Sequence, residues 1–296
     1  MPLSLNRAPP ADLDPWIARV VVARIDAVPD FEVDCGLCTD IAFQRLLVGG
    51  EWRVETMNGV RRFGAEPILM GPQSRFMPVR CKGAMSALGV GFRPGALRKL
   101  VGIETAAMMD RIEPGDPLGL LGPAGSSDFA RTSSPDHWAD VLEERLREVI
   151  RRNNPEPPDP ISTAFEHASF VDPNLSPGEF AEEQGVSLRT VERVVRRDFG
   201  LTPRTVLRRA RALDLASFLL GIGDEADEAD FMERFTDQSH RIREFQAFFG
   251  VTPTVFLSEP RILLTINLET RAARRLEVLR RIAPGERRPW HAGEHG

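Results

Sequence analysis

A pentapeptide that occurs twice, fifty residues apart, is the feature that most constrains the fold of this chain. Phe199-Gly200-Leu201-Thr202-Pro203 returns as Phe249-Gly250-Val251-Thr252-Pro253. Glycine readily takes the left-handed conformation that closes a helix, threonine caps the next helix, and proline fits its first position. Each copy therefore predicts a helix, a sharp break and a second helix. The alternative is that two helix junctions share this cap chemistry by chance.

The segment before the first copy has the spacing of a helix-turn-helix unit. Such a unit needs a small residue where two helices cross, a glycine where the chain reverses, a capping serine, and apolar residues that lock the second helix. Ala181, Gly185, Ser187, Val191 and Val194 supply these features in order. The sequence therefore predicts a first helix-turn-helix unit directly before the pentapeptide.

The second helix of this unit is expected to have two different faces. Its docking face consists of Leu188, Val191 and Val195, which share one side of a helix. The other side carries an arginine stripe that we expect to point outward, formed by Arg189, Arg193, Arg196 and Arg197. Guanidinium groups bind both guanine edges and phosphates, so the stripe suits a helix in the major groove of DNA. A solvated arginine face without a ligand is the alternative.

A second unit is expected ahead of the second pentapeptide. Its docking face consists of Ile242, Phe245 and Phe249. Gln238 has the chemistry to read adenine, Ser239 to bond a base or a phosphate, and Arg243 to bind a phosphate. These residues predict a second DNA contact.

Two helix-turn-helix units, a bridging helix from Pro203 to Leu220 and the closing Gly-x-Thr-Pro segment resemble the AraC/XylS family of bacterial regulators. The resemblance extends from near Leu175 to Leu257 and implies that each unit presents a recognition helix to consecutive major-groove segments of operator DNA. Together with the arginine stripe, it predicts DNA contacts for Ser187, Arg189, Thr190, Arg193, Arg196, Arg197, Asp237, Gln238, Ser239, Arg241 and Arg243. Further implied partners are a small-molecule effector, a second copy of the chain, and RNA polymerase if the regulator is an activator.

The second unit departs from the family pattern. Asp230 and Arg234 stand where the family usually has small residues in the turn, and Arg241 stands where it has an apolar one. Between Asp224 and Glu233 there are six acidic residues and no basic one. The alternative function is therefore an interaction protein of regulator ancestry, with a degenerate second unit that no longer reads DNA.

The N-terminal half contains short β-leaning runs separated by turn signals. The runs are Arg19–Ile25, Ile41–Val48, Trp52–Met57 and Met85–Phe92, and the turn signals are Gly49-Gly50, Asn58-Gly59 and Gly71-Pro72. They predict a sandwich or barrel. Patches at Met70–Arg75 and Gly89–Ala96 resemble the cupin-like sensor half of some members of the family. Helical spacing is expected over Ala96–Leu100 and Trp138–Ile150.

The expected fold class is α+β and multidomain, with a β-rich, cupin-like N-terminal domain followed by an all-α DNA-binding domain. We expect residues 1–153 to form the sensor or dimerisation domain with a helical end, and the proline-rich residues 154–160 to form a linker. The AraC-type DNA-binding domain then covers 161–260, and a basic helical extension covers 261–296. Between Arg261 and Trp290 this extension has eight arginines and three acids. It either contacts flanking phosphates or, as we favour, packs on the DNA-binding domain.

No catalytic residue, metal or cofactor is expected, and the protein is not expected to be an enzyme. Metal-dependent cupins use a histidine cluster, and the first histidine of this chain is His137. Cys35 and Cys38 form a lone C-x-x-C motif, for which ordinary buried thiols are favoured over a thiol-based sensor or half of a metal site.

The charge distribution favours one localised nucleic-acid contact. The net charge of −5 argues against general coating of nucleic acid, but Val186–Arg211 contains eight arginines and two acids. The N-terminus lacks a signal-peptide pattern and no run of about 18 apolar residues occurs. A cytoplasmic protein without a membrane contact is expected.

Overall fold

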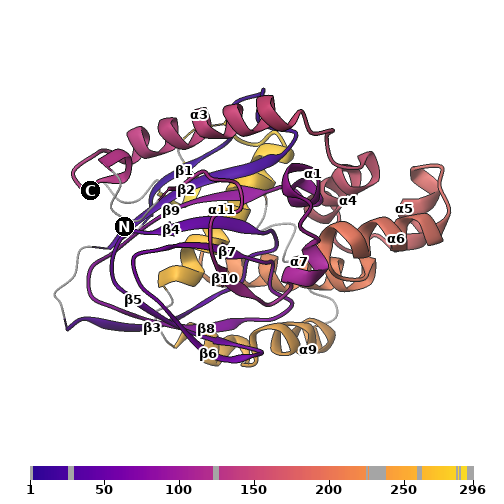
Figure 1. The fold of residues 1–296 in the computed structure, drawn as a ribbon. Helices are drawn as coiled ribbons and strands as arrows, with labels where there is room; N and C mark the ends of the chain where they lie inside the picture. The colour runs from indigo at the N-terminus through magenta and orange to yellow at the C-terminus, as the bar shows by residue number, and fades with distance from the viewer. Residues whose placement is uncertain are drawn as a thin grey trace.

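A computed structural model describes residues 3–25, 30–122, 127–224, 226, 238–258, 262–284, 286 and 288–291. Within these residues the N-terminal half forms two antiparallel sheets (Figure 1). The larger sheet has the order β1 (Leu3–Arg7), β2 (Ile17–Ile25), β9 (Met85–Phe92), β4 (Phe43–Leu47), β7 (Pro67–Met70) and β10 (Ile112–Pro114). The smaller sheet has the order β3 (Glu32–Leu37), β8 (Met77–Lys82), β5 (Glu51–Thr56) and β6 (Gly59–Phe63). The β-rich N-terminal domain predicted from the sequence is therefore confirmed.

Side-chain alternation explains how the smaller sheet is built. In β5, Trp52 and Val54 are buried, while Glu51, Arg53 and Glu55 between and beside them are exposed. This is the pattern of a sheet with one wet face. The Asn58-Gly59 turn joins β5 to β6 as predicted, with Gly59 at φ 99°. Most of β6 is exposed, which is why its apolar signal is too weak to appear in the sequence.

Helices cover the outer face of the larger sheet. The short helices α1 (Ala96–Val101) and α2 (Thr105–Met108) and the 3-10 turn η1 (Ser127–Phe129) precede the long helix α3 (Pro135–Asn153). α3 runs along the top of Figure 1 and buries Trp138, Leu142, Leu146 and Val149 against the sheet, so the predicted helical stripe is confirmed. Ser134 caps its first turn by accepting a hydrogen bond from the His137 backbone N–H at 3.1 Å.

The proline-rich residues 154–160 lie against the N-terminal domain. The indole N–H of Trp16 donates to the Glu156 carbonyl at 3.2 Å, and the Lys99 ammonium pairs with the Glu156 carboxylate at 2.6 Å. Asp159 then caps the following helix by accepting from the Ile161 N–H at 3.0 Å. The predicted linker is therefore fixed to the N-terminal domain by these contacts.

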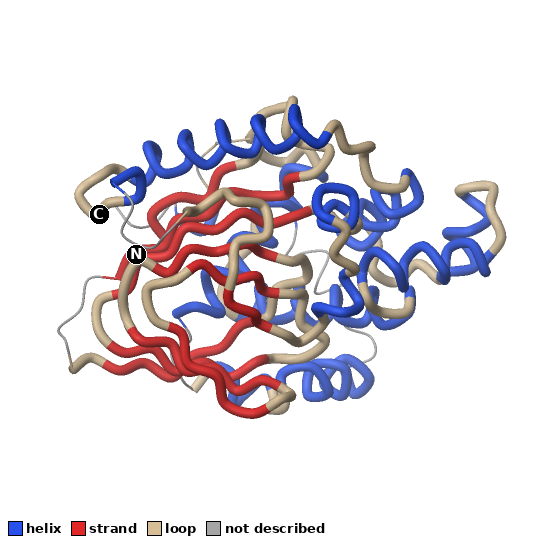
Figure 2. Tube along the Cα trace, in the orientation of Figure 1, coloured by secondary structure: helices blue, strands red, loops and turns tan. Residues whose placement is uncertain are grey.

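The C-terminal half is helical, as predicted. Its elements are α4 (Pro160–Val171), α5 (Pro177–Glu183), α6 (Leu188–Phe199), α7 (Pro203–Leu219), α9 (Gln238–Phe249), α10 (Pro253–Leu257), α11 (Ile262–Val278) and the 3-10 turn η3 (Pro289–His291). Figure 2 shows the strands gathered on one side of the molecule, with the helices labelled α5 and α6 in Figure 1 at the opposite edge. In the described residues no helix is both long and apolar enough to cross a bilayer.

Helix α11, which begins the predicted basic extension, lies between the two halves of the protein. Leu263 and Ile266 join the core between the sheets, while Leu264 and Leu268 join the core that α7 and α9 form. The favoured packing on the helical domain is therefore observed, and α11 also packs on β2 and β3. Arg271 and Arg274 are not placed to contact flanking phosphates, the other interpretation of the extension, because both side chains are only 5% exposed.

Six side chains form a largely buried interdomain ion-pair network: Asp40, Arg93, Glu166, Asp214, Arg271 and Arg274. Arg271 pairs with Asp40 at 2.6 Å and with Asp214 at 3.1 Å. Arg274 pairs with Glu166 and lies 3.5 Å from Asp40. Burial alone would raise the pKa of Asp40, but the charges of the two arginines outweigh it and lower that pKa. The network joins the loop after β3 to α4, α7 and α11.

Candidate nucleic-acid interface

The first helix-turn-helix unit consists of α5 and α6 around an aromatic core. Phe165 of α4 packs edge-on against Phe180 and Phe199, with ring centroids 5.0 and 5.6 Å apart. Ala181, Val191 and Val194, placed inside by the sequence pattern, are buried. Gly185 makes the reversal with φ 65°, a backbone conformation that side chains other than glycine rarely take. The first helix-turn-helix unit is therefore confirmed, and these residues have the roles that the sequence predicted.

Both helices of the unit begin at capped residues. Ser176 and Glu179 form a capping box at α5, with reciprocal hydrogen bonds of 2.9 and 3.1 Å. Ser187 caps α6 by accepting from the Thr190 N–H at 3.1 Å, and its hydroxyl lies 2.9 Å from the Thr190 hydroxyl. The caps fix where α6 starts, and therefore which side chains point outward.

The outward face of α6 carries Arg189, Arg193 and Arg196, whose side chains are exposed. Arg196 pairs with Glu192 at 3.6 Å on the surface. Within the described residues neither Arg189 nor Arg193 makes an ion pair. Leu188 is 46% exposed, so its prediction as a docking residue is wrong: it lies in the first turn, before the helix meets the core.

Arg197 does not belong to the exposed stripe. Its guanidinium pairs with Asp198 at 2.6 Å and with Asp159 at 3.0 Å, and the hydrogen bonds to Asp198 raise its pKa. Asp198 is buried, accepts from the Ser162 hydroxyl and lies 3.6 Å from Arg98 of α1. These contacts fasten the last turn of α6 to both α4 and the N-terminal domain. The prediction that Arg197 faces outward is therefore wrong.

The bridging helix α7 is clamped to α9 through Glu244. Arg211 donates to this buried carboxylate at 2.8 and 2.6 Å, and Arg208 lies 3.4 Å from it. Arg209 is buried and donates to the Asp40 and Gln73 carbonyls, both at 3.0 Å. Among the eight arginines of Val186–Arg211, Arg197, Arg209 and Arg211 are thus engaged internally.

Two exposed arginines of α7 were missed by the sequence reasoning. Arg204 and Arg208 lie four residues apart on the outer side of the helix, next to the first unit in the chain. Their helical spacing was the signal that could have identified them as further cationic positions. Arg204 and Arg208 are thus exposed basic positions on α7, although Arg208 also lies 3.4 Å from Glu244.

The fifty-residue repeat has the same geometry at both of its copies. Gly200 and Gly250 have φ angles of 72° and 74°. Thr202 accepts from the Thr205 N–H, and Thr252 from the Val255 N–H, both at 3.3 Å. The predicted helix, break and helix are confirmed twice.

The second unit is described only in part. Phe245 and Phe249 are buried with ring centroids 4.5 Å apart, but Ile242 is 38% exposed and does not dock as predicted. Arg243 is exposed on α9. Asp230, Arg234 and Asp237 lie outside the described residues, as do the side chains of Gln238, Ser239 and Arg241. Their contacts with DNA remain predictions.

The cysteines give little support to a thiol-based sensor. The side chains of Cys38 and Cys81 are both buried, and Cys38 is a free thiol. Burial raises the pKa of Cys38 strongly, and the nearby Asp40 charge adds to that effect. A buried thiol of raised pKa holds little thiolate and is a poor nucleophile. The side chain of Cys35 lies outside the description, and among the described residues no cluster of three metal-ligating side chains occurs.

Two family models match separate parts of the chain. Residues 180–259 match the family described as "Helix-turn-helix domain", which is of the AraC type. Residues 6–114 match the family described as "Domain of unknown function (DUF6597)". The sequence matches none of the curated proteins.

Several solved structures are similar at low identity. An apo variant of ToxT from Vibrio cholerae is 11% identical with a TM-score of 0.47, over 80% of this chain and 96% of that chain. Wild-type ToxT from Vibrio cholerae with a bound unsaturated fatty acid is 11% identical with a TM-score of 0.44, over 80% and 94%. The AraC-like transcriptional activator CuxR is 14% identical with a TM-score of 0.25, over 71% and 85%.

The family match and the geometry coincide. The matched residues 180–259 begin inside α5 and include the recognition helix α6, the bridging helix α7 and both copies of the repeat. Residues 180–259 of this chain are therefore an AraC-type helix-turn-helix domain, and a β-rich domain precedes it.

Proposed function

We propose that this protein is a sequence-specific, effector-modulated regulator in which α6 reads operator DNA from the major groove. The observation that carries the proposal is the outward face of α6. Arg189 and Arg193 are exposed one helical turn apart and make no ion pair with a described residue. The opposite face of the same helix is buried and both ends are fixed. Such a helix presents guanidinium groups in a defined orientation, as base recognition requires.

The remaining predicted residues of the first unit divide into two roles. Ser187 and Thr190 lie at the N-terminus of α6, where free backbone N–H groups and the helix dipole favour a DNA phosphate. Arg196 faces outward beside Glu192 and suits a phosphate contact. Arg197 positions α6 by holding its last turn to Asp198 and Asp159. We therefore assign base reading to Arg189 and Arg193.

The second unit is proposed to contact the neighbouring segment of DNA. The repeated cap and the clamp of Glu244 to α7 support a fixed position for α9 relative to the first unit. The proposed contacts are those of Asp237, Gln238, Ser239, Arg241 and Arg243. Sequence specificity is proposed to depend more on the first unit, because its helix α6 is capped and carries exposed arginines.

The N-terminal domain, residues 1–153, is proposed to sense an effector or to dimerise, and residues 161–260 to bind DNA. Residues 154–160 connect the two, and α11 in the 261–296 extension packs on both. A homodimer and, for an activator, RNA polymerase are the proposed macromolecular partners besides DNA. The protein is not proposed to be an enzyme.

An electrophoretic shift assay with the promoter of the protein's own gene tests the proposal. Arg189→Ala and Arg193→Ala should each weaken specific binding by about 1–3 kcal/mol, which is roughly 5- to 150-fold. Arg62→Ala is the matched control, because Arg62 is an exposed arginine on β6, far from α6 in the fold. Unchanged affinity of both α6 variants at fixed salt would contradict the proposal.

A further inference from the structure

Both copies of the fifty-residue repeat contact the N-terminal domain. In the first copy, Gly200 packs so closely against Met109 that a Cβ at Gly200 would lie 2.6 Å from the Met109 Cε. In the second copy, the ring centroid of Phe249 lies 6.3 Å from that of Phe76, and the Phe76 N–H donates to the Phe248 carbonyl at 2.8 Å. The N-terminal domain therefore contacts the two helix-turn-helix units at equivalent points, the C-terminal ends of α6 and α9.

The contact of Phe76 with α9 uses both its backbone and its ring. The last carbonyls of an α-helix have no partner within the helix. Phe248 lies in the last turn of α9, and the N–H of Phe76 satisfies its carbonyl. The Phe76 ring lies on Gly36 of β3, where the Cβ of any other residue would overlap the ring. The sheet therefore leaves room for the side chain that contacts α9.

The N-terminal residues that make these contacts belong to two segments, 71–76 and 105–111, which we call the interdomain platform. The Gly71 N–H donates to the Arg111 carbonyl, and the Asp110 N–H to the Pro72 carbonyl, both at 3.0 Å. The Asp110 carboxylate accepts from the backbone N–H of Ser74 at 2.7 Å and from its hydroxyl at 2.5 Å. These hydrogen bonds join the two segments along their length, so the contacts to α6 and to α9 come from one rigid element.

The platform also contacts the bridging helix α7 between its two ends. The buried side chain of Gln73 accepts from the Thr39 N–H at 2.6 Å and from the Thr39 hydroxyl at 2.8 Å. The Gln73 carbonyl accepts from Arg209 of α7 at 3.0 Å. The platform therefore contacts α6, α7 and α9.

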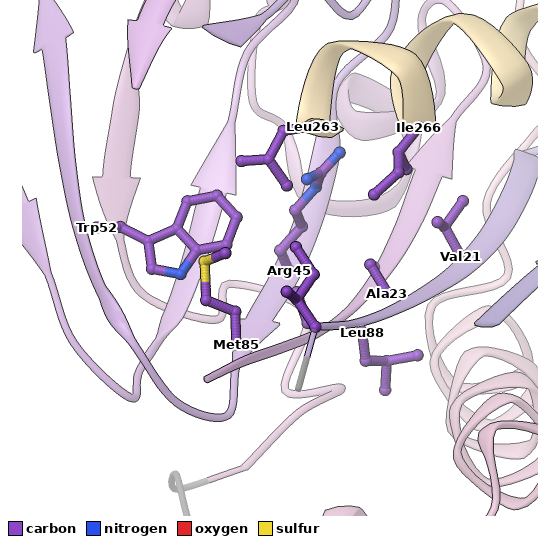
Figure 3. Close-up of a pocket in the computed structure, with 11 residues that line it drawn as sticks. Val21, Ala23, Arg45, Trp52, Met85, Leu88, Leu263 and Ile266 are labelled. Atoms are coloured by element: carbon purple, nitrogen blue, oxygen red, sulfur yellow. The ribbon is translucent and has the colours of Figure 1, made fainter. Parts of the chain in front are cut away.

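Helix α11 keeps the platform and the helical half together. Figure 3 shows Leu263 and Ile266, from its first turns, pointing into the space beside Trp52 between the sheets. The guanidinium of Arg45 on β4 donates to the Asn267 side chain of α11 at 3.3 Å. Because α11 packs on the sheets and also on α7, the helical half is fixed against the platform.

We propose that the platform fixes the distance and the angle between the two helix-turn-helix units. α7 joins the units through its own packing and the Glu244 clamp, whereas the platform fixes the end of each unit's last helix. The N-terminal domain thereby determines which spacing between two DNA segments the protein accepts. Phe76 and Asp110 are positioning residues, since they act through α9 and the platform. The inference rests on the proposed function, in which both units contact DNA.

A change of spacing in the operator is the perturbation that a fixed pair of units cannot follow. One added base pair moves the second DNA segment by about 3.4 Å along the axis and rotates it by about 35°. A rigid protein then loses the base contacts of one unit, and each good bidentate contact contributes roughly 5- to 150-fold to affinity. Units joined only through α7 adjust more easily and lose less.

Shift assays with the full-length protein test the inference, using a site selected from random DNA and the same site with one base pair inserted between its two segments. At fixed salt, wild type should lose at least about tenfold in affinity on insertion, and Phe76→Ala less than about threefold. Asp110→Gly should behave like Phe76→Ala, because glycine accepts the φ of 56° at this position but removes the acceptor for Ser74. Asp110→Asn keeps an acceptor and should retain the wild-type penalty.

Phe63→Ala is the matched control for Phe76→Ala. Phe63 is a buried phenylalanine of β6 that pairs with Trp52, and Trp52 pairs with Cys81 at the opposite end of β8 from Phe76. The control should lower Tm by leaving a cavity in the core and should keep the wild-type spacing penalty. The ratio of the two affinities therefore separates the positioning role from a general loss of stability.

A distance measurement tests the platform without DNA. Spin labels are attached at Glu182→Cys on α5 and Gln246→Cys on α9, both exposed positions, in a Cys35→Ser background. Cys38 and Cys81 are buried and should stay unlabelled. Double electron–electron resonance should give one narrow distance distribution in the otherwise wild-type protein, and a broader one when Phe76→Ala is added.

The inference is overturned if Phe76→Ala and Asp110→Gly keep the wild-type spacing penalty, if Phe63→Ala relaxes it equally, or if Phe76→Ala leaves the label distances unchanged. A wild type that tolerates the insertion as well as Phe76→Ala does would also overturn it. Any of these results together with a selected DNA motif removes only the inference. If wild type selects no motif, the proposed function fails, and the label distances alone then decide whether the platform fixes the units.

Discussion

Replacing Asp40 by asparagine removes one charge from the buried interdomain ion-pair network while nearly preserving the shape of the side chain. Asp40 accepts from Arg271 at 2.6 Å and faces Arg274 at 3.5 Å. In Asp40→Asn, the two arginines keep Asp214 and Glu166, but the adjacent buried Arg209 makes the local charge positive. The variant should loosen the contact between the sheets and the helical domain.

The expected loss follows from the geometry of the network. Removing one partner of a buried ion pair costs about 3–5 kcal/mol. Arg271 retains Asp214 at 3.1 Å, and the Asp40 side chain is itself 17% exposed, so the lower end is expected. A loss of about 3 kcal/mol corresponds to a decrease of about 5 °C in Tm for a chain of this length.

Urea and thermal unfolding of the full-length protein measure this loss. Asp12→Asn is the control, because Asp12 and Arg147 form an ion pair at 2.7 Å on the surface. Exposed pairs contribute little, so the control should lose no more than about 0.5 kcal/mol. Equal losses in the two variants would refute the reasoning that the network fastens the two halves together.

Three further predictions concern pH, helix caps and thiols. In the folded protein the pKa of Asp40 is lowered, because the arginine charges outweigh the effect of burial. The stabilisation by the Asp40 charge is therefore fully present above the unfolded-state pKa of about 3.9, and it is lost as the pH falls through the folded-state pKa. The Tm difference between wild type and Asp40→Asn should therefore shrink below about pH 4, and a constant difference from neutral pH to strong acid would contradict this. Thr202→Ala and Thr252→Ala should each cost about 1 kcal/mol in urea unfolding, with serine variants close to wild type, because both threonines cap helices; alanine variants as stable as the serine variants would count against these caps. In a Cys35→Ser, Cys81→Ser background, Cys38 should react with a thiol probe far more slowly in the folded protein than in concentrated urea, and equal rates would restore the thiol-sensor alternative.

Local patterns in the sequence were sufficient for the elements that local chemistry determines. The cap residues of the repeat, the reversal at Gly185 and the buried stripe of α3 all depend on neighbours within a few residues. The same holds for the strands with long apolar runs, such as β2 and β9. Short or mostly exposed strands such as β6 and β10 have too little apolar signal, since only pairing with distant strands stabilises them.

The side chains whose location was predicted wrongly or missed are those whose partners are distant in the sequence. Arg197 has the helical spacing of the exposed stripe, but Asp159, 38 residues away, turns it toward α4. The burial of Arg271 and Arg274 could not be predicted either, because their partners Asp40 and Glu166 lie more than one hundred residues away in the chain. The burial of Arg45 in β4 was not predicted, because the residue lies within an apolar strand segment. A charged residue between apolar neighbours was itself the signal of an unusual environment.

Selection of binding sites from a random pool of double-stranded DNA tests the central claim most directly. Wild-type protein and Arg62→Ala should enrich the same motif. Arg189→Ala and Arg193→Ala should each lose preference at particular positions of that motif, mostly guanines, because a guanidinium binds the O6 and N7 edge of guanine. An identical motif from all four proteins, or no motif from the wild type, would contradict the account.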